Sequence, residues 1–376
     1  MGNLKVRISH LHRMTLPVAI ILLVLAVLFL GLRSKSQPGG NTVTWLSDQK
    51  ALQFNKTSIA YVENIRLFGY TQETGHFTMQ MAVAPAGVEK QGFRPILLLH
   101  DGIDHNQLAV WSWGKSLIVM NGDDYDYSKR WSRISAKNTF SPGETTFITI
   151  SSGESGTALY INGKLARKRK DLRLTLPDSG MGPRLILGNS GYGRHGWSGE
   201  ISVLALYNVV FSPELVGTHY LEWQQKGKLP SSPIENTIFL YAFDEHLNAS
   251  TADSSGRNQP MQLPKKLKVF HKKLLAPPWQ NAAWNRSFVS DAILNLFGFM
   301  PLGAAMCLWL RQAPEFLQRR MTLIIVVTSF VLSLFIETVQ AWLPGRSSSQ
   351  LDLYLNTIGG LGGILFVNVL RRQGKK

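Results

Sequence analysis

The sequence predicts a multi-domain membrane protein in which an all-β sandwich is inserted between an N-terminal transmembrane helix and a three-helix α-helical membrane bundle. Long uncharged apolar runs lie near both ends, whereas the middle of the chain is polar, rich in aromatic residues and broken by turn residues. The 376 residues include 40 Lys and Arg against 24 Asp and Glu, a net charge of +16. Such a balance is typical of proteins that bind nucleic acid or an anionic membrane surface, and the apolar runs favour the membrane.

The N-terminal apolar run covers residues 14–32 and carries no charge. At about 1.5 Å rise per residue, a helix of this length spans most of a hydrocarbon core about 30 Å thick. A cleaved signal peptide is the alternative, but the run is long for one and the following "RSKSQPGG" has no cleavage site of the A-x-A type. We therefore expect a short tail, residues 1–13, followed by an uncleaved transmembrane helix.

Three further apolar runs near the C-terminus predict transmembrane helices at about 292–310, 321–343 and 353–370. Basic residues flank the four predicted spans. They are Lys5, Arg7 and Arg13, then Arg311, Arg319 and Arg320, then Arg371, Arg372, Lys375 and Lys376. Four spans put all three groups on one side, which the positive-inside rule assigns to the cytoplasm. Both termini are then cytoplasmic, and the middle of the chain faces outward.

Residues 45–245 read as short strands separated by Gly, Pro, Asn and Asp. The runs that predict strands are "HFTMQMAVAP", "PILLLH", "LAVWSW", "SLIVM", "TFITIS", "ALYING", "RLILGN" and "EISVLALYN". Their spacing of about 8 to 15 residues is typical of an antiparallel sandwich or a jelly roll. A domain of this length is ample to bury a core between two sheets.

Two stretches of this middle region resemble laminin-G-like and concanavalin A-like jelly rolls. They are "ALYINGKLARK" (158–168), where Asn162-Gly163 supplies the turn of a hairpin, and "LILGNSGYGRHGWSGEISVLALYNVVFSPELV" (185–216). "LYAFDEHLNASTADSSGRN" (240–258) resembles a segment that often opens such domains, yet here it closes one. The resemblance therefore implies that the strand order is permuted or that this strand pairs at an edge.

The same resemblance implies a glycan as ligand, because such folds commonly bind glycans and some cleave them. Cleavage needs two carboxylates that flank one bond, and the E-x-D-x-x-E-like strand of relatives that hydrolyse β-glucans is not found in this sequence. Binding is therefore the favoured reading. The candidate ligand-binding residues are Asp101, Asp104, Asp123, Asp124, Tyr125, Asp126 and Tyr127. Aromatic rings could stack on sugars, and Asp123, Asp124 and Asp126 could hold calcium; the alternative is that all seven are solvated loop residues.

Residues 246–287 form a predicted linker that is rich in Pro, Trp and Lys. Its lysines could attract anionic lipid headgroups, at about 1 kcal/mol each, and a solvated spacer is the other reading. The lysines concerned are Lys265, Lys266, Lys268, Lys272 and Lys273. Since they account for part of the basic balance, and since no helix-turn-helix or aromatic-basic platform is found in the sequence, we expect no nucleic-acid partner.

Polar residues recur at helical spacing inside the three C-terminal runs. Ser333, Glu337 and Gln340 fall at i, i+4 and i+7, which is one face of a helix. The residues of the predicted intramembrane polar cluster are Asp291, Asn295, Ser333, Glu337, Gln340, Arg346, Asp352 and Asn356. A carboxylate at the bilayer centre is costly, and a shallower, inward-facing Glu337 costs less, particularly where Gln340, Asn295 or Asn356 hydrogen-bonds it.

These residues also carry a second resemblance, to the VanZ-like membrane family, over residues 288–372. The matching segments are "DAILNLFGFMPLG" (291–303) and "SLFIETVQAWLPGRSSSQLDLYLNTIGGLGG" (333–363). The family is bacterial and is linked through a founding member to glycopeptide-antibiotic resistance, without an established general activity. The resemblance thus implies a bacterial inner-membrane location, with the sandwich periplasmic or extracellular.

Two functional hypotheses follow. In the first, the chain is an envelope protein whose sandwich binds a glycan or exopolysaccharide and whose bundle anchors it. In the second, it is an intramembrane enzyme or lipid-handling protein that acts on lipid-linked sugars or phospholipid, with Glu337, Arg346 and Asp352 as candidate catalytic residues. The polar stripe could also be a helix-packing network without chemistry. No cofactor other than calcium is predicted, and the sequence favours a protein that is not an enzyme.

Overall fold

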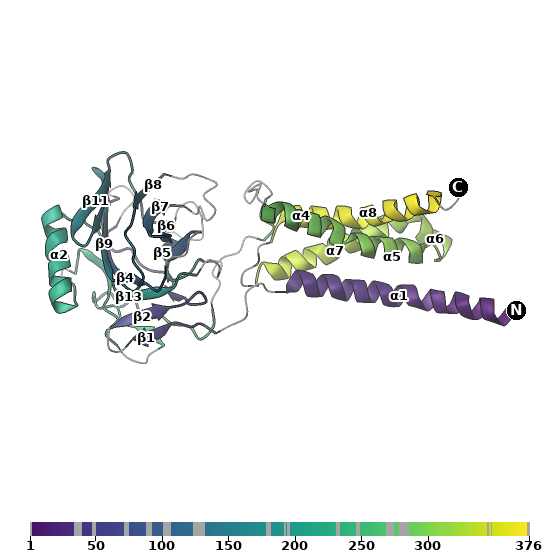
Figure 1. Cartoon of the computed structure of the whole chain (residues 1–376), viewed down its shortest axis with the longest axis horizontal. Coiled ribbons are helices and arrows are strands. Elements are labelled where there is room, and N and C mark those ends of the chain that lie inside the picture. The colour runs from purple at the N-terminus through teal and green to yellow at the C-terminus, as the bar shows by residue number, and fades with distance from the viewer. Residues whose placement is uncertain are drawn as a thin grey trace. The chain divides into compact units, whose positions relative to one another are not determined.

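The computed structural model describes residues 2–33, 40–46, 50–70, 75–87, 92–100, 107–122, 132–177, 182–191, 193, 196–230, 234–245, 249–267, 274–277, 286–343, 346 and 348–373. The chain forms two compact units. One joins Met1–Gln37 to Lys272–Lys376, and the other is Pro38–His271. Figure 1 shows a sandwich of strands in the second unit and a bundle of helices in the first.

The described residues of the second unit form two antiparallel sheets of eight strands each. The first sheet runs in the order β1 (Thr44–Leu46), β2 (Ala51–Phe54), β13 (Gly199–Tyr207), β4 (Phe77–Pro85), β9 (Thr146–Gly153), β10 (Gly156–Ile161) and β11 (Lys164–Arg169), with β14 (Thr237–Tyr241) beside β13. The second runs β15 (Ser250–Thr251), β16 (Met261–Gln262), β3 (Ala60–Val62), β12 (Arg184–Leu187), β5 (Arg94–His100), β6 (Leu108–Trp113), β7 (Ser116–Asn121) and β8 (Arg133–Ala136). Every run that the sequence predicted as a strand forms one, so the predicted β-sandwich is confirmed.

Successive side chains of a strand point to opposite faces of its sheet, and those that point between the two sheets are apolar. Leu97 and Leu99 of β5 point into this core, together with residues such as Met79 and Ile150 of the first sheet. Leu98 points the other way and belongs to a second apolar cluster on the outer face of the second sheet. The members of that cluster are buried, so this outer face is not open to water.

The outer face of the first sheet is covered by a helix that the sequence analysis did not predict, α2 (Pro213–Lys226). Ser212 caps its N-terminus by accepting a hydrogen bond from Leu215 N, and Gly227 ends it in the left-handed conformation. The "SPE" start and the "KG" end were the signals available in the sequence. Val216 and His219 are the residues that α2 buries against the sheet.

The segment that resembles the opening of a jelly roll contributes to both sheets. β14 pairs with the second half of β13, while β2 pairs with its first half, so the two short strands lie along the same side of β13. β16 then pairs with β3 near the edge of the second sheet. Among the described residues, β14 pairs with β13 alone and β15 ends the second sheet, so the C-terminal part of the domain supplies strands with one described partner each to both sheets.

The first unit is a helix bundle. Its helices are α1 (Gly2–Leu32), α4 (Arg286–Gly298), α5 (Met300–Leu310), α6 (Glu315–Arg319), α7 (Met321–Gln340) and α8 (Gln350–Gln373). Within the described residues, four segments are long and apolar enough to cross a membrane: Thr15–Leu32, Val289–Leu310, Met321–Gln340 and Gln350–Gln373. Large apolar side chains point outward along them, for example Leu294, Leu323 and Leu365. An apolar exterior over a bundle core is what a lipid environment requires.

Two features of the bundle differ from the expected three single helices. Phe299 separates α4 from α5 where one helix was expected at 292–310, and Pro301 lies in the first turn of α5, where a proline is tolerated. In addition, α1 packs against the same core: Ile20, Leu23 and other α1 residues join the cluster of α5, α7 and α8 side chains. The N-terminal helix is therefore part of the bundle.

Glycines of α8 let its neighbours approach closely. A Cβ atom at Gly359 would overlap the backbone at Leu296, and one at Gly363 would overlap the backbone of Met300 and Ala304. Gly303 of α5 faces Gly360 in the same way. Such backbone contact between helices is typical of small residues in membrane proteins.

Candidate functional site

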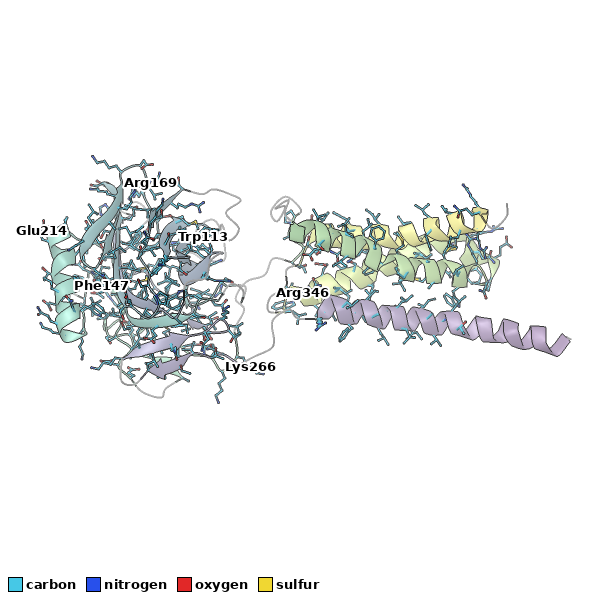
Figure 2. All side chains as sticks on the ribbon, in the orientation of Figure 1. Trp113, Phe147, Arg169, Glu214, Lys266 and Arg346 are labelled. Carbon is cyan, nitrogen blue, oxygen red and sulfur yellow. The ribbon has the colours of Figure 1, made fainter. Side chains whose placement is uncertain are left out.

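The bundle unit and its tails contain only four acidic residues, Asp291, Glu315, Glu337 and Asp352. Glu315 lies on the short helix α6 and pairs with Arg319 there. The other three are near the opposite end of the bundle, where α1 and α7 end and α8 begins, and Figure 2 shows Arg346 at that end. Acids are thus scarce in this unit and concentrated in one place, which marks the place as a candidate site.

Glu337 is the most deeply buried of these acids, with only 1% of its surface exposed. Its Oε2 atom accepts a hydrogen bond from the backbone N of Ser349 at 2.7 Å, and its carboxylate also takes the side-chain hydroxyl of Ser348. The sequence analysis considered Gln340, Asn295 and Asn356 as partners of Glu337. The donors that the structure shows are Ser348 and Ser349, which directly precede α8.

The amides of the stripe have other partners. Asn356 Nδ2 donates to Ser333 Oγ at 2.9 Å, which ties α8 to α7 in the buried part of the bundle. Asn295 hydrogen-bonds the carboxylate of Asp352, which ties α4 to α8, and Asp291 lies close enough to Asp352 to interact with it electrostatically. The three polar stripes therefore do face one another, although Asp291 itself is exposed.

Gln340 and Arg346 reach the end of α1. Gln340 Nε2 and an Arg346 guanidinium nitrogen each donate to the carbonyl oxygen of Gly31, both at 2.7 Å. Gly31 lies in the last turn of α1, where carbonyl groups lack partners inside the helix and carry partial negative charge. The positive charge of Arg346 thus stabilises the C-terminus of α1, and the same charge interacts with Glu337 and Asp352.

The segment that precedes α4 is attached to the same loop. Leu275 N donates to Ser348 Oγ, Ala276 N donates to Ser348 O, and Gln350 N donates to Ala276 O. Ala276 and Ser349 thereby form an isolated parallel bridge. The loop between α7 and α8 consequently holds the end of α1, the approach to α4 and the carboxylate of Glu337 together.

Sequence reasoning missed Gly31, Ser348 and Ser349. A backbone carbonyl as acceptor leaves no trace in a sequence, so Gly31 could not have been found. Ser349 could have been, because Ser349-x-x-Asp352 is the pattern of a capped helix start, and Ser349 Oγ does accept a hydrogen bond from Leu351 N.

Chemically, the site is a set of partnered carboxylates beside one guanidinium. Within the described ranges, no group of three or more His, Cys, Asp and Glu residues could hold a metal ion. The buried Oδ1 atom of Asn356 has no hydrogen-bond partner among the described atoms. The contacts of Ser348, Ser349 and Arg346 show what the arrangement does in this structure: it holds together the end of the bundle where α1 and α7 end and α8 begins.

The candidate ligand-binding residues of the sandwich lie outside the described residues. These are Asp101, Asp104, Asp123, Asp124, Tyr125, Asp126 and Tyr127, and the calcium prediction falls on the same segments. The described strand ends that flank these segments are neighbours: Leu108 pairs with both Leu99 and Asn121, and Met120 pairs with Arg133. Both segments therefore begin and end at one end of the second sheet.

Of the linker lysines, Lys265 and Lys266 are described and exposed, while Lys268, Lys272 and Lys273 are outside the described residues. Lys266 forms an isolated bridge with Gly40, and Asn41 N donates to Lys265 O. The backbone at these two lysines therefore belongs to the sandwich, and their contact with anionic lipid stays a prediction.

Two family models match the chain. Residues 237–371 match the VanZ/LLP1 family, and residues 62–217 match the concanavalin A-like lectin/glucanases superfamily. A VanZ-like region at the C-terminus and a concanavalin A-like domain before it are thus both present, as the sequence predicted. The VanZ match begins at β14, within the sandwich, and so extends further toward the N-terminus than residue 288. No curated protein matches the chain.

Solved structures show distant likenesses. A candidate carbohydrate-binding protein from Bacteroides ovatus has 12% identity and a TM-score of 0.39, and the match covers 56% of this chain and 59% of that protein. A domain of an extracellular arabinanase from Geobacillus stearothermophilus, in complex with arabinotriose, has 14% identity and a TM-score of 0.37 over 48% of this chain and 85% of that one. A sialidase module from Ruminococcus gnavus, bound to α2,3-sialyllactose, has 10% identity and a TM-score of 0.32 over 39% and 82%. At these TM-scores the likenesses support no argument about this chain.

Proposed function

We propose that this chain is a bacterial cell-envelope membrane protein whose sandwich binds a glycan outside the cytoplasmic membrane. The observation that carries the proposal is the joining of a concanavalin A-like sandwich to four apolar helices in one chain. A glycan-binding fold attached to a membrane bundle suits a protein that holds a polysaccharide at the cell surface. The sequence lacks the acidic strand of the β-glucan hydrolases, so we assign binding rather than cleavage.

The arrangement of the sandwich supports a glycan-binding surface at one end of the second sheet, where β5 and β7 end and β6 and β8 begin. α2 covers the outer face of the first sheet, and the outer face of the second sheet buries Leu98, Trp111 and Met120. Neither face offers an open polar surface at these positions. The two segments with the acidic and aromatic candidates start from adjacent strand ends, and we propose that Asp124 and Tyr125 in one of them contact the glycan, by hydrogen bonding and by ring stacking.

The charge pattern supports an orientation. Figure 1 shows α6, the start of α1 and the end of α8 at one end of the bundle, and Arg311 at the end of α5 hydrogen-bonds Asn368 near the end of α8. The described basic residues Arg311, Arg319, Arg320, Arg371 and Arg372 therefore lie at the end opposite to Glu337 and Arg346. By the positive-inside rule we assign the basic end to the cytoplasm, and we place the sandwich on the periplasmic or extracellular side.

The test is a glycan array probed with the full chain in detergent micelles. We expect binding to an envelope polysaccharide or to peptidoglycan fragments, and we expect Asp124→Asn combined with Tyr125→Ala to weaken it by about tenfold, the effect of losing one or two polar and stacking contacts. Glu144→Gln, which changes an exposed acid in the turn before β9, is the matched control and should leave binding unchanged. Failure of the natural chain to bind any envelope glycan would overturn the proposal.

A further inference from the structure

One edge of the sandwich is strongly basic. β11 is the last strand of the first sheet and pairs only with β10 in the described part of the sheet. The basic residues along it are Lys164, Arg167, Lys168, Arg169 and Lys170, which we call the β11 cations. All are exposed except Arg169, which is partly buried, and no acidic residue interrupts them.

Four of the five β11 cations have no ion-pair partner among the described residues. Arg169 alone is paired, with Asp171. Arg169 also donates to the backbone oxygen of Arg133, at the start of β8, so the adjoining edge strand of the second sheet adds another basic residue there. Figure 2 shows Arg169 at the top of the sandwich and Glu214 of α2 at its left margin, where Glu214 interacts electrostatically with Tyr160 of β10.

This concentration is local. From 38 to 271 the chain has 24 Lys and Arg against 20 Asp and Glu, a balance of +4, and five of the 24 are the β11 cations. A solvated surface of mixed charges would interleave acids with these bases, as the surface elsewhere on the sandwich does with the pairs Lys226–Glu222 and Lys228–Asp244. The β11 edge therefore carries an excess of positive charge that the acidic residues in the described part of the sandwich do not neutralise.

The β11 cations are arranged along a line, because they follow one edge strand. An extended strand advances about 3.3 Å per residue, so Lys164 and Lys170 are separated by roughly 20 Å along the edge. Register places Arg167 opposite Leu159 on the core-facing side and Lys168 opposite Ala158 on the α2 side, so the charges splay to both sides of that line. Such an arrangement fits a linear polymer with repeated negative groups better than a single small anion, because successive groups can each meet a cation.

We propose that the β11 cations bind an anionic polysaccharide, whose carboxylate, sulfate or phosphate groups pair with Lys164, Arg167, Lys168 and Lys170. The inference rests on the proposed function, since it assigns a charge to the glycan that the sandwich holds. Two other readings predict different behaviour. Charges on an edge strand also prevent pairing with another sheet edge, and clusters of Lys and Arg also bind anionic lipid.

The experiment measures binding of the full chain, in nanodiscs of phosphatidylcholine, to immobilised polymers. The probes are polygalacturonate for carboxylate, heparin for sulfate and poly(glycerol phosphate) for phosphate, with neutral dextran beside them. We expect binding to at least one anionic polymer that weakens steadily as salt rises. Arg167→Gln combined with Lys168→Gln should weaken it by about tenfold, the effect of losing two exposed charge contacts.

Lys115→Gln combined with Lys137→Gln is the matched control, since both lysines are exposed and lie on the second sheet's turns. Equal loss in both double variants would overturn the inference, because net charge alone would then explain the binding. Binding of a neutral envelope glycan that the Arg167 and Lys168 changes do not affect would overturn it while the proposed function stands. No binding to any glycan, charged or neutral, would remove both.

Two further outcomes also decide against the anionic polysaccharide. Vesicles of phosphatidylcholine with and without phosphatidylglycerol test the lipid reading: retention on the anionic vesicles alone, with none on the polymers, would assign the edge to the membrane. Self-association of the double variant with unchanged polymer binding would assign the charges to protection of the β11 edge. We expect the variant with Arg167→Gln and Lys168→Gln to stay monodisperse and to lose affinity for the polymer.

Discussion

At the scale of the residue, His219 of α2 shows how one buried titratable group makes the stability of the sandwich depend on pH. His219 is only 3% exposed, and its Nδ1 atom lies 2.9 Å from Gln80 Oε1. The Nε2 atom of Gln80 in turn donates a hydrogen bond to Thr149 Oγ1. Phe211 packs edge-on against the imidazole. Burial lowers the pKa of His219 to about 4 from an ordinary 6.5, because the charged form loses its hydration.

The sign of the pH dependence follows. Between pH 6.5 and 4 the unfolded chain binds a proton at His219 that the folded chain does not, so the stability present above pH 6.5 is lost as the pH falls toward 4. At pH 5 the loss is about 2 kcal/mol, which lowers the Tm of the sandwich by roughly 5 °C. Thermal unfolding followed by near-ultraviolet circular dichroism measures it. His219→Asn keeps a donor for Gln80 but does not titrate, so its Tm should fall less between pH 7 and 5; equal slopes in the two chains would contradict the prediction.

At the scale of the element, the packing of α8 depends on the absence of side chains. Gly363 faces the backbone of Met300 and Ala304, so Gly363→Ala should force α5 and α8 apart. Gly298, at the end of α4, has open space around its missing Cβ atom, and Gly298→Ala should be tolerated. Both changes add one methyl group to a glycine in a helix, which makes the pair a matched comparison.

We expect Gly363→Ala to destabilise the bundle by roughly 1 to 3 kcal/mol, the usual cost of overpacking, and Gly298→Ala to be neutral or slightly stabilising. Unfolding of the full chain in detergent, followed by the accessibility of the buried Cys307 to a thiol reagent, reports the bundle specifically, because Cys307 is the single cysteine of the chain. Faster labelling in Gly298→Ala than in Gly363→Ala would contradict the close contact of α5 with α8.

Elements also show where sequence reasoning succeeds. The spacing of Ser333, Glu337 and Gln340 fixed them to one helical face, and all three are buried. Alternation identified β5 and β13 because a sandwich strand has two distinct faces. The break at Phe299 was not predicted, since Pro301 in a membrane span is compatible with a continuous helix, with a kink or with a new start. The partners of Glu337 were not predicted either, because loop conformation and not helical period decides which atoms meet it.

At the scale of the whole molecule, the bundle has two chemically distinct ends, and this difference predicts how it inserts. One end holds Asp291, Glu337 and Asp352, whereas the other holds α6 and the described basic residues Arg311, Arg319, Arg320, Arg371 and Arg372. Lys and Arg near the ends of spans are retained on the cytoplasmic side. The sequence predicted this separation from charge counts alone, but it could not predict that Gln340 and Arg346 would join α1 to the acidic end, because that contact lies between residues some three hundred positions apart.

Single cysteines at the two ends test the orientation. Trp342→Cys places a thiol just beyond α7, at a position where the native side chain is 82% exposed, and Gln318→Cys places one on α6 at the basic end. In intact cells, a membrane-impermeant maleimide should label the first and reach the second only after permeabilisation. The natural chain serves as the unlabelled control, because Cys307 is buried. The reverse pattern would put Glu337, Arg346 and the loop that holds both on the cytoplasmic side, where they could not face a glycan; labelling of both positions in intact cells would mean that the bundle does not keep one orientation. The charge difference between the two ends, with three of the four acids of the unit at one and clustered bases at the other, favours the single outward orientation of Trp342.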